Sequence, residues 1–282
     1  MDQSGNNTIY TKPNDSHLEI LSCFPPHPTT KPPLLFVHGS FISAWCWEIN
    51  FMPFFARCGY PCYALSLRGH GGSHGHDRLH WHGLDDYVDD VAQVAQGMER
   101  PPILIGHSMG GLVVQKYLHR AMAESVEVPA MALLASVPPD GLLPMTWWLS
   151  MTRPWLIHDI YWVQAGLAQF GNYSEVCTAL FSDTLPEATA HHYLVRTQAE
   201  SQRALLEMSS WSPLPAINFE PPPTLVLGAE RDALVPSFMV EATAEAYNTS
   251  AEVLPGLAHI MMLERDWKDA ARPLLNWLET LE

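Results

Sequence analysis

Short apolar runs alternate with longer stretches of helical periodicity along most of the chain. The runs at 34–37, 62–67, 103–105, 131–135 and 224–227 each begin shortly after one or more prolines. Proline suits the entry of a strand, where no hydrogen-bond donor of the ladder is lost. Continuously apolar strands that alternate with helices are typical of a parallel sheet covered on both faces. The pattern therefore predicts an α/β fold.

Three segments have the periodicity of amphipathic helices: 84–99, 108–123 and 267–281. In 84–99 the apolar residues share one face and the acids lie on the other. The apolar set is Tyr87, Val88, Val91, Val94, Ala95 and Met98, and the acids of its first turns are Asp85, Asp86, Asp89 and Asp90. Acidic side chains there interact favourably with the positive end of the helix dipole.

The alternation stops from about 138 to 215, where no clear strand occurs. Five of the ten tryptophans fall in this stretch: Trp147, Trp148, Trp155, Trp162 and Trp211. Three prolines at 221–223 then restart the strand pattern. We therefore expect a polar N-terminal segment with a first strand at 1–30, a core formed by 31–137 and 216–282, and an inserted helical cap at 138–215.

Composition excludes several classes of protein. The chain of 282 residues is 47% hydrophobic and 16% charged, which allows a sizeable core and rules out wholesale disorder. Its 15 basic and 30 acidic residues give a net charge of −15. Nucleic acids and anionic membranes need clustered Lys and Arg, so neither is an expected partner.

Location and redox state follow from what the sequence lacks. No secretory signal is visible, and no apolar run approaches the roughly 18 residues of a spanning helix. The five cysteines are an odd number with no CxxC pair, which favours reduced thiols over a disulfide framework. We expect a cytoplasmic protein, and the sequence leaves its oligomeric state open.

The strongest chemical signal is Gly106-His107-Ser108-Met109-Gly110, which lies between a predicted strand and a predicted helix. In this context G-x-S-x-G is the turn that exposes a nucleophilic serine hydroxyl above the sheet. The two glycines remove side chains that would collide as strand and helix approach. The alternative is an ordinary turn that uses glycine for its geometry alone.

A serine nucleophile needs a base, and the base needs a carboxylate to orient it. His259 follows the last predicted strand and is the predicted base, with a structural histidine as the alternative. Of the other histidines after Ser108, His119 lies on the helix that follows the nucleophile, and the rest, His158, His191 and His192, lie in the insertion. The predicted acid is Asp232, after the strand at 224–227. Its alternative reading is a turn or helix cap, and Asp140 and Glu230 are the other candidate acids.

The negative charge of a tetrahedral intermediate needs two backbone donors. We assign them to the N–H of Met109, which follows the nucleophile, and the N–H of Ser40, in the loop after an early strand. Phe41 is the fallback for the second donor.

These residues resemble the α/β-hydrolase fold superfamily, in the order His38-Gly39-Ser40, Arg68-Gly69-His70-Gly71-Gly72-Ser73, Gly106 to Gly111, Gly228-x-x-x-Asp232 and Gly256-x-x-His259. The resemblance spans about 31–282 and is closest to the capped esterase, lactonase and perhydrolase-like group. It implies a twisted, mostly parallel eight-stranded sheet flanked by helices, with the site at the carboxyl ends of the strands. Serine as nucleophile distinguishes the chain from dehalogenases and epoxide hydrolases, which attack with aspartate.

The sequence contains two further groups of candidate functional residues. His70, His74, His76, His80 and His82 lie near Asp77, but their loop spacing does not fix tetrahedral geometry, so no metal is assigned and no cofactor is expected. A cap over the strand ends lines the pocket by position, so Trp147, Trp148, Trp155 and Trp162 are candidate substrate-binding residues. Phe41 and His107, outside the cap, are further candidates.

We therefore expect hydrolysis of a carboxylic ester of an uncharged, apolar or aromatic small molecule through an acyl-enzyme on Ser108. A lactonase, a C–C bond hydrolase, a thioesterase or an acyltransferase would use the same triad. Outside catalysis, a slow-turnover ligand-binding receptor is the alternative. The expected partner is a small-molecule ester or lactone.

Overall fold

A computed structural model describes residues 7–10, 17–164, 173–209 and 214–281. Its strands form one sheet in the order β1-β2-β4-β3-β5-β6-β7-β8. The central strands β3 (Leu34–Val37), β4 (Cys62–Leu65), β5 (Ile103–His107) and β6 (Met131–Leu134) pair in parallel, and so do β7 (Thr224–Ala229) and β8 (Ala251–Leu254). The predicted mostly parallel sheet is confirmed.

Two antiparallel strands complete the sheet at its N-terminal edge. β1 (Asn7–Tyr10) pairs with β2 (Glu19–Cys23), which pairs with β4. Both lie within the N-terminal segment for which the sequence predicted a single strand. Their mixed polarity explains the difference, because antiparallel strands at a sheet edge need not be apolar on both faces and their apolar signal is weaker.

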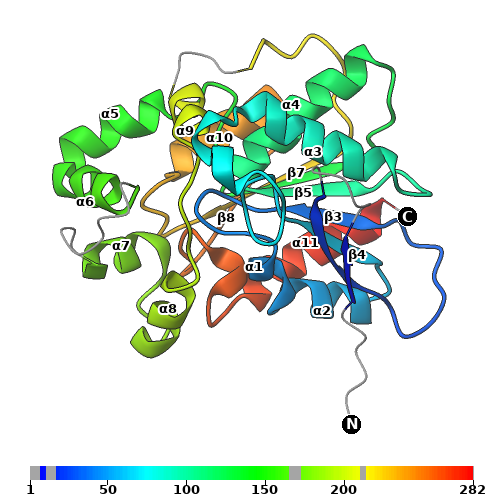
Figure 1. The fold of residues 1–282 in the computed structure, drawn as a ribbon, viewed down its shortest axis with the longest axis horizontal. Helices are drawn as coiled ribbons and strands as arrows, with labels where there is room; N and C mark the ends of the chain where they lie inside the picture. The colour runs from blue at the N-terminus through cyan, green and yellow to red at the C-terminus, as the bar shows by residue number, and fades with distance from the viewer. Residues whose placement is uncertain (1–6, 11–16, 165–172, 210–213, 282) are drawn as a thin grey trace.

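Helices cover both faces of the sheet (Figure 1). On one face lie α1 (Trp45–Glu48), α2 (Phe51–Arg57) and α11 (Lys268–Thr280), and on the other lie α3 (Leu84–Gln96), α4 (Met109–Ala123) and α10 (Ser237–Ala246). Alternate residues of β3 supply the two cores: Leu34 and Phe36 face α1, α2 and α11, whereas Leu35 and Val37 face α3 and α4. This burial on both faces explains the continuously apolar strands.

The predicted helix at 84–99 ends at Gln96, and one of its outward-facing acids was placed wrongly. Asp90 is fully buried because it pairs with Arg68, whose Nη2 lies 2.7 Å from Asp90 Oδ1. Periodicity could not reveal a partner that comes from a loop 22 residues earlier.

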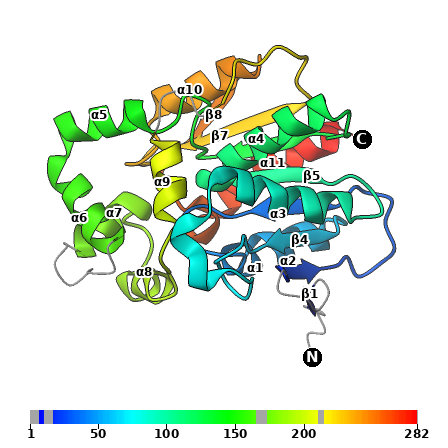
Figure 2. The same cartoon turned by 45° about the horizontal axis from the view of Figure 1, so that its top comes forward.

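Between β6 and β7 the chain leaves the sheet for a set of helices. They are α5 (Leu143–Thr152), α6 (Pro154–Gln164), α7 (Tyr173–Leu180), α8 (Glu187–Leu194) and α9 (Gln202–Met208). In Figures 1 and 2, α5 to α8 lie together beyond one end of the sheet, and α9 lies closer to α3. Short 3-10 helices at His76–Trp81 (η1) and Met261–Leu263 (η3) complete the description.

Candidate active site

Three predicted side chains meet at the carboxyl ends of the strands. Ser108 follows β5, Asp232 follows β7 and His259 follows β8. Ser108 Oγ lies 3.0 Å from His259 Nε2, and His259 Nδ1 lies 2.8 Å from Asp232 Oδ2. Nδ1 donates to the carboxylate, which leaves Nε2 free to accept the serine proton, as a Ser-His-Asp relay requires.

The turn that carries Ser108 is strained and closely packed. Its φ of 52° and ψ of −120° are rare for a residue with a side chain. A Cβ on Gly106 would lie 2.6 Å from Gly110 O, and one on Gly110 would lie 2.3 Å from His38 O. Both positions therefore require glycine, because the strand, the helix and the loop after β3 approach one another here.

Asp232 is buried and its second oxygen is also occupied. Oδ1 accepts hydrogen bonds from the N–H groups of Leu234 and Val235, each at 2.8 Å, so this side chain is both turn cap and histidine partner. The other candidate acids lie elsewhere: Asp140 is exposed, and Glu230 Oε2 accepts from the N–H of Gly256.

The loop after β3 lies against the nucleophile. A Cβ on Gly39 would lie 2.9 Å from Ser108 Cβ, and Ser40 Oγ donates to Met109 Sδ at 3.3 Å. The two predicted oxyanion donors are thus neighbours beside Ser108. The fallback donor is engaged elsewhere, because the Phe41 N–H donates to Glu200 Oε2 at 3.4 Å.

His107 is buried beside the triad. Its Nε2–H donates to His259 O at 2.9 Å, so it supports the backbone of the histidine loop. Burial, together with the nearby His259 ring, holds the pKa of His107 well below its usual range, so the ring is neutral. His107 also lines the pocket described next.

A cavity of about 140 Å³ opens at Ser108 and is predominantly apolar. Its walls come from the core loops and from the helices inserted between β6 and β7: Ser40, Phe41, Ile42, His107, Ser108, Val137, Leu142, Met145, Leu180, Thr197, Leu205, Met208, Leu234, Val235, His259 and Ile260. Among the residues that the structure describes, no acid, lysine or arginine lines it.

Three of the candidate tryptophans, Trp147, Trp148 and Trp155, do not line this cavity. Trp147 and Trp155 are 67% and 77% exposed, and Trp148 packs against the small cluster around Leu149. The side chain of Trp162 lies outside the part of the molecule that the structure describes. On α5 the inward face carries Met145 and Leu149, which turns Trp147 to solvent and explains why residue type alone was misleading.

A larger cavity, about 480 Å³, lies near the amino ends of the strands, beside Pro33, Pro61 and Arg100. It contains no residue of the triad. Of these two cavities, the smaller one has Ser108 and His259 in its wall.

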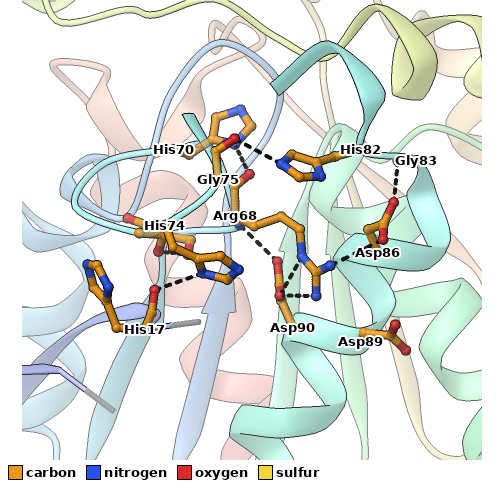
Figure 3. A network of polar contacts seen from close by, with 12 residues as sticks. His17, Arg68, His70, His74, Gly75, His82, Gly83, Asp86, Asp89 and Asp90 are labelled. Atoms are coloured by element: carbon orange, nitrogen blue, oxygen red, sulfur yellow. Dashed lines mark hydrogen bonds and ion pairs between the residues drawn. The ribbon is translucent and has the colours of Figure 1, made fainter. Parts of the chain in front are cut away.

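Side chains of the histidine-rich loop contact backbone carbonyl oxygens, which hold the loop in place (Figure 3). His82 Nε2 contacts Gly75 O at 2.9 Å, and His74 Nδ1 contacts His17 O at 2.9 Å. His70 instead faces Glu200, with His70 Nε2 3.1 Å from Glu200 Oε2. Within the ranges that the structure describes, no group of His, Cys, Asp and Glu is arranged to hold a metal ion.

Glu200 and Gln198 are site residues that the sequence did not reveal. They contact Phe41 from the chain segment between α8 and α9. Neither belongs to a motif, and a polar stretch between two helices reads as an ordinary loop. Only the fold brings this stretch next to Phe41.

A parallel sheet that presents a hydrogen-bonded serine, histidine and aspartate at its strand ends is typical of α/β hydrolases. The model of the alpha/beta hydrolase family matches residues 34–272, and the chain belongs to that family.

Curated relatives carry several names. The chain is 39% identical over 112 residues to a non-heme chloroperoxidase of Streptomyces lividans, covering 38% of this chain and 37% of that protein. It is 26% identical over 246 residues to a non-heme haloperoxidase of Rhodococcus erythropolis, covering 81% and 86%. To a monoacylglycerol lipase of Mycolicibacterium smegmatis it is 27% identical over 236 residues, covering 79% and 80%.

Solved structures agree on the fold. An esterase from Exiguobacterium antarcticum superposes with a TM-score of 0.72 at 17% identity, covering 97% of this chain and 100% of that one. A bromoperoxidase from Bacillus anthracis superposes with a TM-score of 0.70 at 21% identity, with the same coverage. In the described part of the chain, no helix is both long and apolar enough to span a membrane.

Proposed function

We propose that the protein is a serine hydrolase that cleaves a carboxylic ester through an acyl-enzyme on Ser108. The observation that carries the proposal is the pair of contacts that His259 makes, 3.0 Å to Ser108 Oγ and 2.8 Å to Asp232 Oδ2. A serine hydroxyl is a weak nucleophile on its own, and this relay is the arrangement that activates it.

The reaction has two halves. His259 Nε2 takes the proton as Ser108 Oγ attacks the ester carbonyl, and the N–H groups of Met109 and Ser40 stabilise the oxyanion, each by roughly 3 kcal/mol. The imidazolium returns its proton to the leaving alcohol as the C–O bond breaks. Water, deprotonated by His259, then attacks the acyl-enzyme and releases the acid and Ser108.

The substrate class follows from the cavity. The described residues of its walls include no acid, lysine or arginine, which favours an uncharged substrate with an apolar acyl group. At about 140 Å³ it is smaller than the roughly 300–1,000 Å³ of most small-molecule sites, which favours a short acyl chain. The inserted helices supply Leu142, Met145, Leu180, Leu205 and Met208 to the walls, so we propose that the segment 138–215 acts as the cap.

The acceptor of the acyl group is a separate question. Similarity to proteins named haloperoxidases favours hydrogen peroxide as an alternative to water, with a peroxy acid as product. Lactones and thioesters would form the same acyl-enzyme. Adding peroxide to the ester assay and measuring the peroxy acid distinguishes the two acceptors.

The direct test is Ser108→Ala, assayed on p-nitrophenyl esters from acetate to dodecanoate. We expect kcat/KM to fall by about 10⁴-fold or more, with acetate and butyrate the best wild-type substrates. Ser150→Ala, an exposed serine on α5, is the matched control. Undiminished hydrolysis by Ser108→Ala would refute the mechanism.

A further inference from the structure

Phe41, which follows the proposed oxyanion donor Ser40, is held on both sides by the segment that returns from α8 to α9. The N–H of Gln198 donates to Phe41 O at 2.8 Å, and the N–H of Phe41 donates to Glu200 Oε2 at 3.4 Å. Phe41 has a φ of 66°, in the left-handed region that a residue with a bulky side chain rarely adopts. Such a conformation persists only where the surroundings hold it.

Glu200 is buried and its two oxygens face four donors. Oε1 accepts from Tyr87 Oη–H at 2.8 Å and from the N–H of Ser201 at 2.7 Å. Oε2 accepts from the N–H of Phe41 and from His70 Nε2–H at 3.1 Å. A carboxylate, which only accepts, fits this set of four donors, whereas a carboxamide would turn an NH₂ group toward two of them.

The hydrogen-bond partners of His70 indicate that its ring is protonated. His70 Nε2 faces the Glu200 carboxylate, and His70 Nδ1 faces the carbonyl oxygen of Arg68 at 3.1 Å. Both ring nitrogens therefore donate, which makes the ring an imidazolium. Burial lowers the pKa of His70, but the Glu200 charge and hydrogen bond outweigh it, so the pKa is raised. The two charges compensate each other inside the protein.

Hydrogen bonds of neighbouring residues fix the loop that carries His70 to the core. Arg68 bonds Asp90 Oδ1 at 2.7 Å and Asp86 Oδ1 at 3.1 Å, so the loop that carries His70 is fixed to α3 (Figure 3). The Gln198 side chain adds two bonds to the same loop, from Nε2 to Gly69 O at 2.9 Å and from the N–H of Gly71 to Oε1 at 2.9 Å.

From this geometry we propose that Glu200 and Gln198 are positioning residues, which hold the Ser40 N–H at the oxyanion position by fixing Phe41. On its N-terminal side, His38 Nδ1–H donates to Gly39 O at 2.8 Å, which holds the peptide that contains the Ser40 N–H. Phe41 supplies the second restraint, on the C-terminal side. The role in catalysis rests on the proposed function, because the oxyanion arises in that reaction.

The test is Glu200→Gln, with Glu207→Gln as matched control. Glu207 lies on α9 and accepts from the N–H of Leu84, so it links α9 to α3, away from the hydrogen bonds that Phe41 makes with Gln198 and Glu200. We expect Glu200→Gln to lower kcat by about 10- to 100-fold, part of the 10²–10³-fold cost of losing a whole oxyanion donor. KM should stay within about twofold, since only the transition state uses the donor. Glu207→Gln should keep wild-type kcat.

Gln198→Ala is the second variant, and it removes no buried charge. It should lower kcat in the same direction but less, because the backbone bond to Phe41 O remains. Wild-type kcat in Glu200→Gln, or a loss confined to KM, would overturn the proposal. If Glu200→Gln does not fold, wild-type kcat in Gln198→Ala overturns it.

Two further readouts separate this proposal from the proposed function. Labelling of Ser108 by a fluorophosphonate needs the same oxyanion donors and no ester, so its rate should fall in parallel with kcat. Hydrogen exchange of the peptide that covers 39–42 should accelerate in the Glu200 and Gln198 variants. If the wild type neither hydrolyses esters nor reacts with the probe, the proposed function fails. Unchanged exchange of that peptide would then overturn the positioning role as well.

Discussion

The helices inserted between β6 and β7 contain two regions that are attached to the molecule very differently. The outer region, α5 and α6, leaves Trp147, Met151 and Trp155 mostly exposed and packs through a small apolar cluster around Leu149 and Leu156. The inner region, from Leu180 to Ser201, is joined to both catalytic loops by hydrogen bonds.

The inner region has one anchor on each loop. Leu180 O accepts from the N–H of Ile260, next to His259, and Ser182 contacts the buried Glu264 that also accepts from the N–H of Ala258. The second anchor is formed by Gln198 and Glu200 on Phe41. The inner region of the insertion therefore supports the catalytic geometry, whereas the outer region has few contacts with it. Substitutions in the inner region should change activity or the free energy of unfolding more than substitutions in the outer region.

The largest effect is expected at the first anchor. Glu264→Ala would leave three buried donors without their acceptor: the N–H and Oγ–H of Ser182 and the N–H of Ala258. We expect the free energy of unfolding to fall by about 3 kcal/mol, measured by urea denaturation. Glu252→Ala, an exposed glutamate on β8, should change it by less than about 0.5 kcal/mol. Equal effects of the two substitutions would show that the anchor contributes nothing.

The His70–Glu200 pair behind the second anchor predicts that the free energy of unfolding depends on pH. Because the pKa of His70 is raised in the folded protein, the charged ring stabilises the fold at pH values below its unfolded-state pKa of about 6.5. This stabilisation is lost as the pH rises through the folded-state pKa. Burial raises the pKa of Glu200, but the His70 charge together with the hydrogen bonds from His70, Ser201 and Tyr87 outweighs it, so the pKa is lowered. Its contribution is therefore present above the unfolded-state pKa of about 4.3 and is lost as pH falls through the folded-state pKa. The surrounding His38 stays neutral, because burial lowers its pKa to about 3, and Tyr87 stays neutral because burial raises its pKa.

His70→Gln checks this dependence. The difference in unfolding free energy between wild type and variant should shrink from about pH 6.5 upwards, by at most about 1.4 kcal/mol per pH unit. Arg68, Asp86 and Asp90 also face this region, and they are present in both proteins. A difference that stays constant between about pH 6 and about pH 9 would contradict the ion pair.

A smaller effect is expected where the outer region reaches the cavity. Met145 lies in the cavity wall, so Met145→Trp should shorten the acyl chain that fits. The ratio of kcat/KM for butyrate over acetate esters should fall by about 10-fold. Met151→Trp is the matched control, because Met151 lies on the same helix and is 68% exposed. An unchanged ratio in Met145→Trp would place the acyl group elsewhere.

The smallest effect is expected at the exposed rings. Trp147→Ala and Trp155→Ala should change kcat/KM on short esters by less than about threefold, and the unfolding free energy by about 0.5 kcal/mol or less. Both are measured in the same assays as the cavity variants. A loss of tenfold or more would mean that these rings bind substrate.

Sequence reasoning predicted the sheet and the meeting of Ser108, Asp232 and His259 because both depend on local patterns. An apolar run after proline predicts a parallel strand, and the carboxyl ends of parallel strands lie at one edge. The G-x-S-x-G turn marks its own position between strand and helix. These signals do not need knowledge of distant contacts.

The remaining features depend on contacts between segments far apart in the chain. Asp90 was expected at the surface because its partner Arg68 comes from another loop. Glu200 gave no signal because its donors come from the loop after β3, from α3 and from the loop of His70. Tryptophan content located the inserted helices, but which face of α5 turns inward is decided by packing. Hydrophobicity alone therefore selected Trp147 where the cavity uses Met145.

The account rests most heavily on Ser108 as the nucleophile. Incubation with a fluorophosphonate, followed by intact-mass and peptide mass spectrometry, tests this directly. We predict one adduct per chain, located on Ser108, with ester hydrolysis lost in proportion to labelling and no adduct in Ser108→Ala. An adduct on another residue, or full activity in the completely labelled protein, would contradict the account.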